Sequence, residues 1–245
     1  MRRTFSFVPF VVAFIVLTGT PAKVKEITHR EATPATRVEI EAGAKPSEVL
    51  LPEPGKTGPL SLEEAIAKRR SVREFKDDPV RLIELSQLLW AAQGITGEDG
   101  FKRAAPSAGA KYPLEIFVVA GRVDGLTSGI YHYEPDSHSL TAVKLGDFRE
   151  ELCGEALGQK WVEEASLSIV IAAVYERTME KYGERGVRYV HMEVGFVAEN
   201  IYLQTESLAL GTTFVGAFSD GGVKKLLKMD GMEPLGIMPV GVKQQ

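Results

Sequence analysis

Hydrophobic and polar positions recur along the chain with periods that predict both helices and strands. A capping box at 61–64 precedes an apolar stretch and predicts a helix that ends near residue 69. Leucines at helical spacing predict a second helix over 79–94. Residues 94–113 are rich in Gly, Pro and Ala and therefore predict a loop.

The middle of the chain has the pattern of buried strands. Residues 114–120 and 167–174 are apolar runs, the second rich in β-branched residues, and each predicts a buried strand. Residues 129–133 and 139–143 flank a Pro-Asp turn and predict a hairpin. A short helix is expected over 148–157.

The longest predicted helix covers residues 187–210 and is apolar on more than one face. In a chain of this size, such a helix predicts a subunit interface as well as a core. Gly211 is expected to end it as the C′ residue. A strand over 212–218, a short helix over 223–227 and a strand over 235–242 follow. Helices and strands mix without regular βαβ alternation, which indicates the α+β class.

Residues 1–22 have the pattern of a signal peptide or N-terminal anchor. A basic start precedes an apolar run over 5–17, which is too short for a membrane-spanning helix. This predicts export or membrane anchoring; a frayed apolar N-terminus in a cytoplasmic protein is the alternative. Residues 23–59 carry several prolines and predict a linker or a loosely packed arm. Residues 60–245 remain as one folded domain.

Composition and charge exclude several classes of function. The chain of 245 residues is 44% hydrophobic and 25% charged, which is usual for a globular protein. It has 29 Lys and Arg against 33 Asp and Glu, so the basic excess typical of nucleic-acid-binding proteins is missing. The single cysteine, Cys153, excludes an intramolecular disulfide and a Cys-rich zinc site.

Several well-known site motifs are also missing from the sequence. It contains no P-loop, no Rossmann glycine fingerprint and no G-x-S-x-G nucleophile elbow. The four histidines, His29, His132, His138 and His191, are scattered. His132 and His138 flank the predicted hairpin turn, but no carboxylate pattern completes a metal site there. Surface histidines, and no bound metal, are therefore expected.

Residues 69–73, here called the arginine segment, end the first predicted helix with Arg69, Arg70, Ser71 and Arg73. Guanidinium groups bind phosphate through paired hydrogen bonds, and a serine hydroxyl adds a neutral one. A phosphate site is therefore one interpretation of this segment. The alternative is a basic helix end that complements the helix dipole.

Two stretches of small residues offer room for a planar ligand. They are the proline loop (106–113), with Pro106, Ser107 and Ala108, and the Gly-Ala segment, Gly216 and Ala217. Small residues let a flat ring lie against backbone N–H and C=O groups. A tight turn and a plain strand end are the alternatives.

Lys181 and Tyr182 lie just ahead of the longest predicted helix. An ammonium group and a phenol side by side can serve as an acid/base pair near a cofactor. The pair is therefore a candidate for catalysis, and a solvated charged loop is the alternative interpretation.

Taken in order, these segments resemble the nitroreductase superfamily of FMN-dependent oxidoreductases. The arginine segment matches the pattern R-R-S-x-R, and the proline loop matches P-S-A-G-x-x-Y-P before a strand. A long helix, L-G at 210–211 and P-V-G at 239–241 complete the pattern. Within the superfamily, the chain looks most like the SagB-type (thiazole/oxazole-forming) dehydrogenases, on the residues at 103–110, 129–133, 181–183 and 189–195.

The chain departs from the family pattern in two places. Residues 195–200 are G-F-V-A-E-N, whereas SagB-type relatives often have G-H-x-x-Q-N. Other superfamily members continue past P-V-G into a tail with a phosphate-binding Lys or Arg. Here Gln245 follows soon after that motif, so we expect this contact to be absent or replaced, and Lys243 is a poor candidate for the replacement.

The resemblance implies a sandwich with a central mixed sheet flanked by helices, which dimerises through the long helix and holds FMN in two sites at the dimer interface. By position, the arginine segment contacts the phosphate, ribityl chain and pyrimidine edge of FMN, and Arg70 favours the anionic reduced flavin. The proline loop lines the ring from the other subunit, and the Gly-Ala segment lies beside the ring through its backbone. Lys181 and Tyr182 match a Lys-Tyr pair that assists proton removal in azoline-oxidising members.

The expected function is hydride transfer between a small organic substrate and FMN in a homodimer. One alternative is a general NAD(P)H-dependent nitro- or quinone reductase on the same fold. The other is a flavin-binding protein without turnover. No nucleic-acid partner is expected, and a membrane is a partner only through the N-terminal segment.

Overall fold

The computed structural model describes residues 48–98 and 100–244; the predicted leader, and the predicted arm up to residue 47, lie outside these ranges. The strands are β1 (Glu48–Leu50), β2 (Val80–Arg81), β3 (Leu114–Ala120), β4 (Val123–Asp124), β5 (Gly129–Glu134), β6 (Ser139–Leu145), β7 (Leu167–Ala173), β8 (Leu210–Thr212) and β9 (Glu233–Val242). The helices are α1 (Leu62–Lys68), α2 (Leu82–Gln93), the 3₁₀ helix η1 (Ala108–Ala110), α3 (Arg149–Glu155), α4 (Trp161–Glu164), α5 (Tyr175–Tyr182), α6 (Arg185–Ser207) and α7 (Asp220–Leu227). Within this described part, no helix is both long and apolar enough to cross a membrane.

Seven strands form one sheet in the order β1-β6-β5-β3-β7-β9-β8. Every neighbouring pair in this sheet is antiparallel, and β2 and β4 form a separate parallel pair. The expected α+β class is confirmed. The expected mixed sheet is not found among these seven strands, because each runs against the direction of its neighbour; an isolated bridge between Ser71 and Thr212 adds a parallel contact at the edge.

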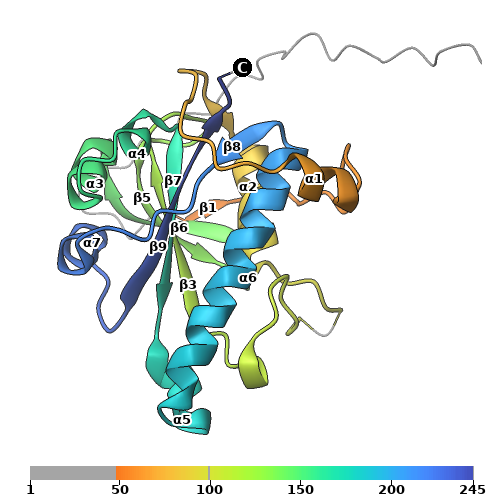
Figure 1. The fold of residues 1–245 in the computed structure, drawn as a ribbon, viewed down its shortest axis with the longest axis vertical. Coiled ribbons are helices and arrows are strands. Elements are labelled where there is room, and N and C mark those ends of the chain that lie inside the picture. Colours follow the sequence, from red (N-terminus) through yellow and green to blue (C-terminus); the bar gives the residue numbers. More distant parts are fainter. Residues whose placement is uncertain (1–47, 99, 245) are drawn as a thin grey trace, which may run out of the picture. The chain divides into compact units, whose positions relative to one another are not determined.

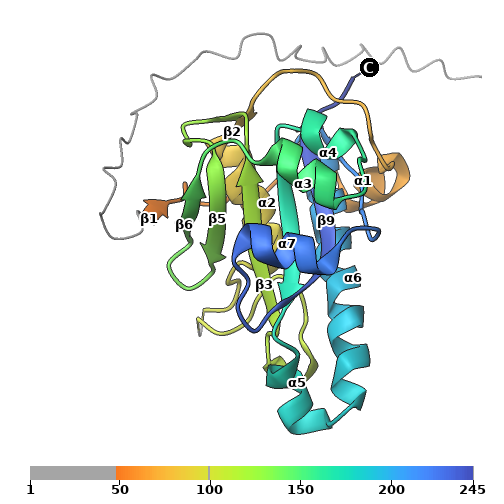
Figure 2. The same cartoon turned by 90° about the vertical axis from the view of Figure 1, so that its left-hand side faces the viewer.

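Helices cover both faces of the sheet (Figure 1, Figure 2). Helices α2 and α6 pack on one face, and α3, α4 and α7 pack on the other. The central strand β7 is buried throughout, which accounts for its unbroken apolar sequence. Its alternate side chains serve both cores: Ile169 and Ile171 face α2 and α6, whereas Val170 and Ala172 join the opposite core.

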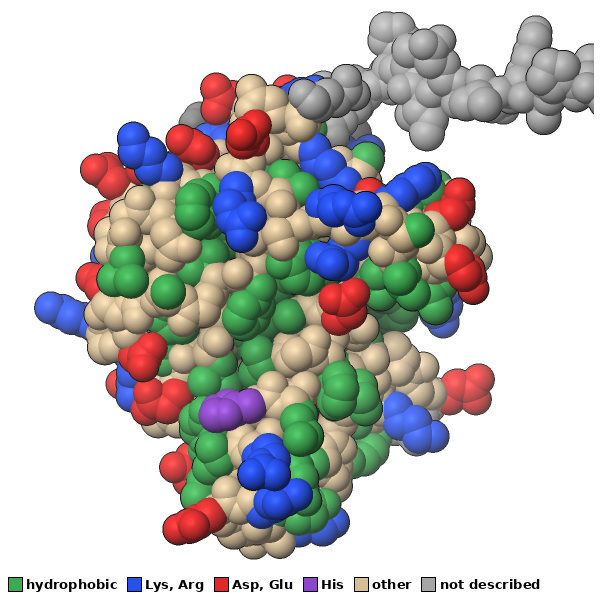
Figure 3. Space-filling view, in the orientation of Figure 1, with side chains coloured by type: hydrophobic (Ala, Val, Ile, Leu, Met, Phe, Trp, Pro, Cys, Tyr) green, Lys and Arg blue, Asp and Glu red, His purple; other side chains and the backbone are tan. Residues whose placement is uncertain are grey.

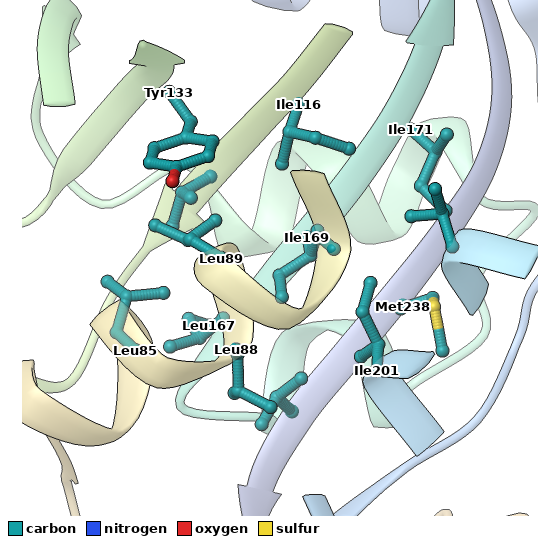
Figure 4. Close-up of a cluster of buried hydrophobic side chains, with 14 of the residues drawn as sticks. Leu85, Leu88, Leu89, Ile116, Tyr133, Leu167, Ile169, Ile171, Ile201 and Met238 are labelled. Carbon is teal, nitrogen blue, oxygen red and sulfur yellow. The ribbon is translucent and has the colours of Figure 1, made fainter. Parts of the chain in front are cut away.

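The larger core lies between the sheet and the pair of helices α2 and α6 (Figure 4). Leu85, Leu88 and Leu89 of α2 are fully buried there, together with Ile169 of β7 and Ile201 of α6. Burial of each such side chain contributes ~1.5–3 kcal/mol. This packing fixes the rotation of α6 about its axis, and therefore decides which of its faces remains open to solvent.

The long helix ends earlier than its apolar pattern predicts. α6 stops at Ser207, and the left-handed turn is made by Ala209, whose φ is 56°. Gly211 is therefore not a C′ residue: it lies inside β8, buried in the sheet. The physical reason is tertiary, because Leu210 pairs with Val242 and draws the chain into the sheet before the apolar sequence ends.

Two other elements differ from the sequence expectation. The strand expected over 212–218 is reduced to β8 and one further bridge at Val215. Lys181 and Tyr182, for which a solvated loop is one interpretation, are the last two residues of helix α5. Only Thr178 of α5 is buried, so this helix lacks the apolar stripe that would announce it in the sequence.

The part of the predicted arm that the structure describes packs on the domain. β1 pairs with β6 at the edge of the sheet, and Leu51 is buried. The Pro52 carbonyl accepts a hydrogen bond from Ser86 of α2, and the Gly55 N–H donates to the Gln87 side chain at 2.8 Å. Residues 48–59 are therefore anchored to the sheet and to α2.

The expectation of surface histidines is wrong for His132 and His138. The ring of His132 lies 2.8 Å from Glu115 and 3.0 Å from Glu134, and although burial opposes it, these two carboxylates raise the pKa of His132. Burial lowers the pKa of His138, whose nitrogens contact Ser86 and the Tyr133 hydroxyl. Both rings are structural, because the hairpin folds onto neighbours that the local pattern does not reveal.

His191 is exposed, as expected, and its Nε2 lies 2.6 Å from the Tyr175 hydroxyl. His29 lies outside the described residues. Across the described ranges, no group of three or more His, Cys, Asp and Glu side chains is arranged to hold a metal ion.

Gly236 is a position in β9 where a side chain cannot fit. A Cβ at this residue would overlap the aromatic ring of Phe214. We expect Gly236→Ala to lower the free energy of unfolding by about 1–3 kcal/mol, as is usual for overpacked sites. Urea unfolding measures this loss. In the double variant Gly236→Ala/Phe214→Ala the ring is gone, so the loss of unfolding free energy should be smaller than the sum of the losses in the two single variants. A double variant whose loss equals that sum would contradict the assignment.

Candidate functional site

The arginine segment is held against the sheet as an extra edge strand. Ser71 forms a parallel bridge with Thr212, and the Val72 N–H donates to the Thr212 carbonyl at 2.9 Å. Further along, the Lys76 N–H donates to the Val242 carbonyl at 2.9 Å. Backbone hydrogen bonds to β8 and β9 thus fix the segment where α1 ends.

Two glycines make this close packing possible. A Cβ at Gly211 would lie 2.7 Å from Val72 Cγ1, and a Cβ at Gly241 would lie 2.8 Å from the ring of Phe75. Contacts this short do not occur between ordinary side chains, so both positions require glycine. The L-G and P-V-G motifs therefore serve to seat the arginine segment on the sheet.

Tyr202 of α6 connects the arginine segment to the chain that leads into the Gly-Ala segment. Its hydroxyl accepts a hydrogen bond from the Phe214 N–H at 2.7 Å and lies 3.3 Å from Ser71 Oγ. The Arg69 guanidinium lies 5.0 Å from the Tyr202 ring, and its Nε is 3.8 Å from Glu199. Tyr202 is absent from the sequence interpretation, although a tyrosine within an apolar helix generally has a polar partner for its hydroxyl.

The other two guanidiniums differ in how they are engaged. Arg70 turns back and donates to the carbonyls of Ala67 at 3.1 Å and Arg69 at 2.7 Å, as a basic residue at a helix end does. Arg73 lies 5.5 Å from the Trp161 ring. Within the described ranges neither Arg70 nor Arg73 has a carboxylate partner, so their charges are open to an anion. Figure 3 shows Lys and Arg side chains gathered over the part of this face where α1 and β8 lie.

Gly216 and Ala217, the Gly-Ala segment, are exposed. A Cβ at Gly216 would find only the Phe214 ring, 3.6 Å away, within 4 Å. The Ala217 carbonyl accepts a hydrogen bond from Gln159 at 2.8 Å, which holds the backbone in place. A flat group can therefore approach the Gly216 backbone closely.

The proline loop lies against Lys181 and Tyr182. A Cβ at Gly109, whose φ is 61°, would lie 2.7 Å from the Tyr182 hydroxyl and 3.0 Å from Lys181 Nζ. The Lys181 ammonium lies 5.4 Å from the centre of the Tyr182 ring, which stacks edge-on against Tyr189. The structure thus brings together the candidate acid/base pair and the loop that the family resemblance places at the flavin ring.

Glu193 is a second residue that the sequence interpretation misses. It lies on the core side of α6 and is 2% exposed. Burial raises the pKa of its carboxyl to about 7, while the neighbouring Ser107, Gln93 and Arg103 act in the opposite direction. The signal in the sequence is an acidic residue on the apolar stripe of the long helix, next to Val190, Val194 and Val197.

The predicted site residues form two groups at opposite ends of α6. Figure 1 shows α5, which carries Lys181 and Tyr182, at one end of the helix and α1 and β8 at the other. Arg69 contacts α6 at Tyr202, whereas Tyr182 precedes its first residue, Arg185. At 1.5 Å per residue, Arg185 and Tyr202 are ~25 Å apart along the axis, more than one mononucleotide spans.

Between its two ends, α6 has an open apolar face. Met192 and Phe196 are 51% and 48% exposed, and a Cβ at Gly195 would meet nothing within 4 Å. Spacings of three and four residues place them on one side of the helix. A mid-helix glycine costs roughly 1 kcal/mol relative to alanine, but it permits another element to approach closely.

A cavity of about 700 Å³ lies elsewhere, between residues 53–62 and the helices α2 and α6. Its lining includes Leu62, Trp90 and Asn200 but none of the predicted site residues. The Asn200 side chain donates to the Ala91 carbonyl at 3.0 Å and ties α6 to α2 there.

Comparison with known proteins places these observations in a family. The model of the nitroreductase family matches residues 66–242. A Methanocaldococcus jannaschii protein, whose name assigns it provisionally to the nitroreductases, is 50% identical over 184 residues, covering 75% of this chain and 92% of its own. The microcin B17-processing protein McbC of Escherichia coli is 28% identical over 161 residues, covering 62% of this chain and 57% of its own.

The fold agrees with these sequence matches. A crystal structure from Ralstonia eutropha JMP134, also named provisionally as a nitroreductase, superposes with a TM-score of 0.72 at 28% identity. The superposition covers 81% of this chain and 90% of that one. The chain therefore belongs to the nitroreductase family and is an oxidoreductase of that fold.

Proposed function

We propose that this chain is an FMN-dependent oxidoreductase that works as a homodimer and transfers hydride between a small organic substrate and the flavin. The observation that carries the proposal is the separation of the site residues into two groups along α6. Each group alone is incomplete: one offers guanidiniums and an open glycine backbone, the other a small-residue loop and a Lys-Tyr pair.

Antiparallel pairing of two copies through α6 completes the site. The open face around Met192, Gly195 and Phe196 lies near the middle of the helix. A two-fold axis through this face places the N-terminal end of one α6 beside the C-terminal half of the other. The proline loop and Lys181 of one copy then approach the arginine segment of its partner, and the symmetry makes two equal sites.

The residues present fit a phosphorylated planar cofactor. Arg69, Arg73 and the Ser71 hydroxyl provide donors for a phosphate, and Gly216 leaves space for a ring against the backbone. FMN, when bound, supplies the redox chemistry by taking a hydride from a donor and passing the electrons to an acceptor. The protein binds the phosphate, orients the ring and excludes water from it.

Lys181 and Tyr182 hold and move a proton at the substrate in this proposal. When such a substrate is oxidised, a hydride leaves one substrate atom for the flavin and a proton leaves the neighbouring atom. The proton needs a base to accept it. The ammonium of Lys181 lies 5.4 Å from the centre of the Tyr182 ring, so both groups can reach the same substrate proton. The resemblance to SagB-type dehydrogenases, with its matching Lys-Tyr dipeptide, supports an azoline-type heterocycle as the substrate, and the similarity to the microcin B17-processing protein McbC agrees with a peptide substrate.

The visible spectrum of the purified protein tests the proposal. Bound FMN gives a yellow protein, and the colour should disappear on anaerobic addition of the hydride donor. Bleaching by NADH or NADPH favours the general nitro- or quinone reductase, whereas bleaching only by an azoline-containing peptide favours the SagB-type reaction. A colourless protein that refuses added FMN eliminates the proposal.

Substitution of the Lys-Tyr pair distinguishes these reactions. We expect Lys181→Ala and Tyr182→Phe to slow flavin reduction by an azoline substrate by about 10²–10⁴-fold, because general base catalysis is lost. Flavin reduction by NAD(P)H needs no such base and should change little. Stopped-flow absorbance measures both rates, and Lys225→Ala in α7 serves as the matched control. Unchanged azoline turnover in both variants would remove the catalytic role of the pair.

A further inference from the structure

Glu193 is a buried carboxyl for which packing alone gives no reason. Its Oε1 atom is buried without a hydrogen-bond partner, and so is Nε2 of Gln93, within the part of the chain that the structure describes. An unpaired buried polar atom lowers stability. An apolar side chain of similar size would fill the space without this cost, so the carboxyl points to a role beyond packing.

The groups that face Glu193 come from α2 and from the loop that follows it. Arg103 donates to Gln93 Oε1 at 3.3 Å, which leaves the Gln93 amide nitrogen for the other side. Ser107 Oγ accepts the Tyr112 N–H at 2.8 Å. The Ser107 hydroxyl proton therefore remains available for donation. Ser107 and Gln93 both lower the pKa of Glu193, so their dipoles lie close to its carboxyl.

Two of the other charged groups near this end of α6 are paired with carboxylates. Arg177 of α5 lies 2.6 Å from Glu115 of β3, and Lys111 lies 3.6 Å from Glu180 of α5. Arg103 is the cation whose charge lowers the pKa of Glu193. The protonation of Glu193 is thus set by its burial, by Arg103 and by the Ser107 and Gln93 dipoles.

The proline loop needs such support, because its backbone is unusual. Ala110 and Tyr112 have φ values of 53° and 44°, in the left-handed region that side chains disfavour. Conformations of this kind persist only where surrounding contacts hold them. The Ser107 hydroxyl closes the loop onto Tyr112, so a group that holds Ser107 holds the whole loop.

We propose that Glu193 is a positioning residue of the flavin site: from the core it holds Ser107, and through Ser107 the proline loop that lines the flavin ring. This inference rests on the proposed function. Glu193 does not touch the flavin or the substrate. It acts through the loop, and its effect depends on its protonation.

The sign of the pH effect follows from the pKa of about 7. Above this pH Glu193 is ionised, and a charge-assisted hydrogen bond from Ser107 is roughly twice as strong as a neutral one. FMN should therefore bind about fivefold more tightly at pH 8.5 than at pH 5.5 through this residue. Stability of the protein without flavin runs the other way: because folding raises the pKa from 4.5, the free energy of unfolding falls as the pH rises from about 4.5 to above 7.

Titration of FMN into the dimer, freed of flavin, between about pH 5.5 and 8.5 tests the proposal. The FMN phosphate itself titrates near pH 6, so the unmodified protein is compared with Glu193→Gln, which keeps the shape and cannot ionise. We expect Glu193→Gln to bind FMN about fivefold more weakly at pH 8.5 and equally at pH 5.5. Ser107→Ala should show at least this loss, because it also removes the acceptor of the Tyr112 N–H, and the double variant should show no more than Ser107→Ala alone.

The outcomes separate this proposal from the proposed function. If the unmodified protein binds FMN and Glu193→Gln has the same affinity at every pH, the role of Glu193 is wrong and the proposed function stands. Additive losses in the double variant also overturn it, because Glu193 would then not act through Ser107. If the unmodified protein refuses FMN, both proposals fall. Urea unfolding against pH shows in each case whether Glu193→Gln has removed the titration and whether the variant folds.

Discussion

The double variant Arg69→Ala/Arg73→Ala should bind FMN at least about 100-fold more weakly than the unmodified protein does. Each hydrogen bond between a guanidinium and a charged group contributes roughly 1.5–3 kcal/mol, and two such residues are removed. Every 1.4 kcal/mol corresponds to a tenfold change in affinity. A titration that follows the FMN fluorescence measures the dissociation constant directly, because binding changes the intensity or the polarisation of the emitted light.

The control for this result is a variant that removes positive charge elsewhere. Lys225 is exposed on α7, on the opposite face of the sheet, and Lys225→Ala should leave FMN affinity unchanged. Arg69 also packs on Tyr202, so circular dichroism and thermal unfolding must show that the double variant remains folded. A folded double variant with unaltered affinity would contradict the placement of the phosphate at the arginine segment.

The second large effect is expected at Phe196, although this residue contacts no predicted cofactor group. Phe196→Asp puts a charge at the centre of the open face of α6. Burying an unpaired carboxylate between two helices costs several kcal/mol, so the dimer should dissociate. If the flavin site needs residues from both copies, the resulting monomer should also be colourless. Light scattering coupled to size-exclusion chromatography gives the mass, and absorbance gives the flavin content.

Leu157→Asp provides the comparison, because Leu157 is 68% exposed at the end of α3 and far along the chain from α6. The same chemical change there should leave both mass and colour unaltered. A Phe196→Asp protein that remains dimeric and yellow would show that the two copies do not meet at this face. One that becomes monomeric yet keeps its flavin would show that the site lies within a single chain.

The local pattern of the sequence was sufficient for elements that bury an apolar face. The central strand β7 and the helices α2 and α7 are predicted correctly, because their apolar residues form an unbroken run or recur at helical spacing. The capping box of α1 is present as expected, with Ser61 and Glu64 exchanging hydrogen bonds. Polar helix α5 escaped detection, because its stability comes from contact with α6 and not from an apolar stripe.

The candidate site shows the same division. Arginines, small residues and a Lys-Tyr dipeptide are recognisable in the sequence, since their chemistry is local. The roles of Tyr202 and Glu193 are not recognisable there, because the role of a hydroxyl or carboxyl on a helix depends on which segment packs against it. Gly211 is a further example: it leaves space for the Val72 side chain and does not end a helix.

By itself, the sequence determined the class of fold, the family and the candidate site residues, because periodicity and short motifs can be recognised without knowledge of distant neighbours. Only the tertiary structure decided that the motif residues separate to opposite ends of α6 and that the carboxyl of Glu193 is buried. Such arrangements depend on contacts between segments that are far apart in the chain. No local pattern encodes those contacts, since each side chain is compatible with many neighbours until the core fixes one.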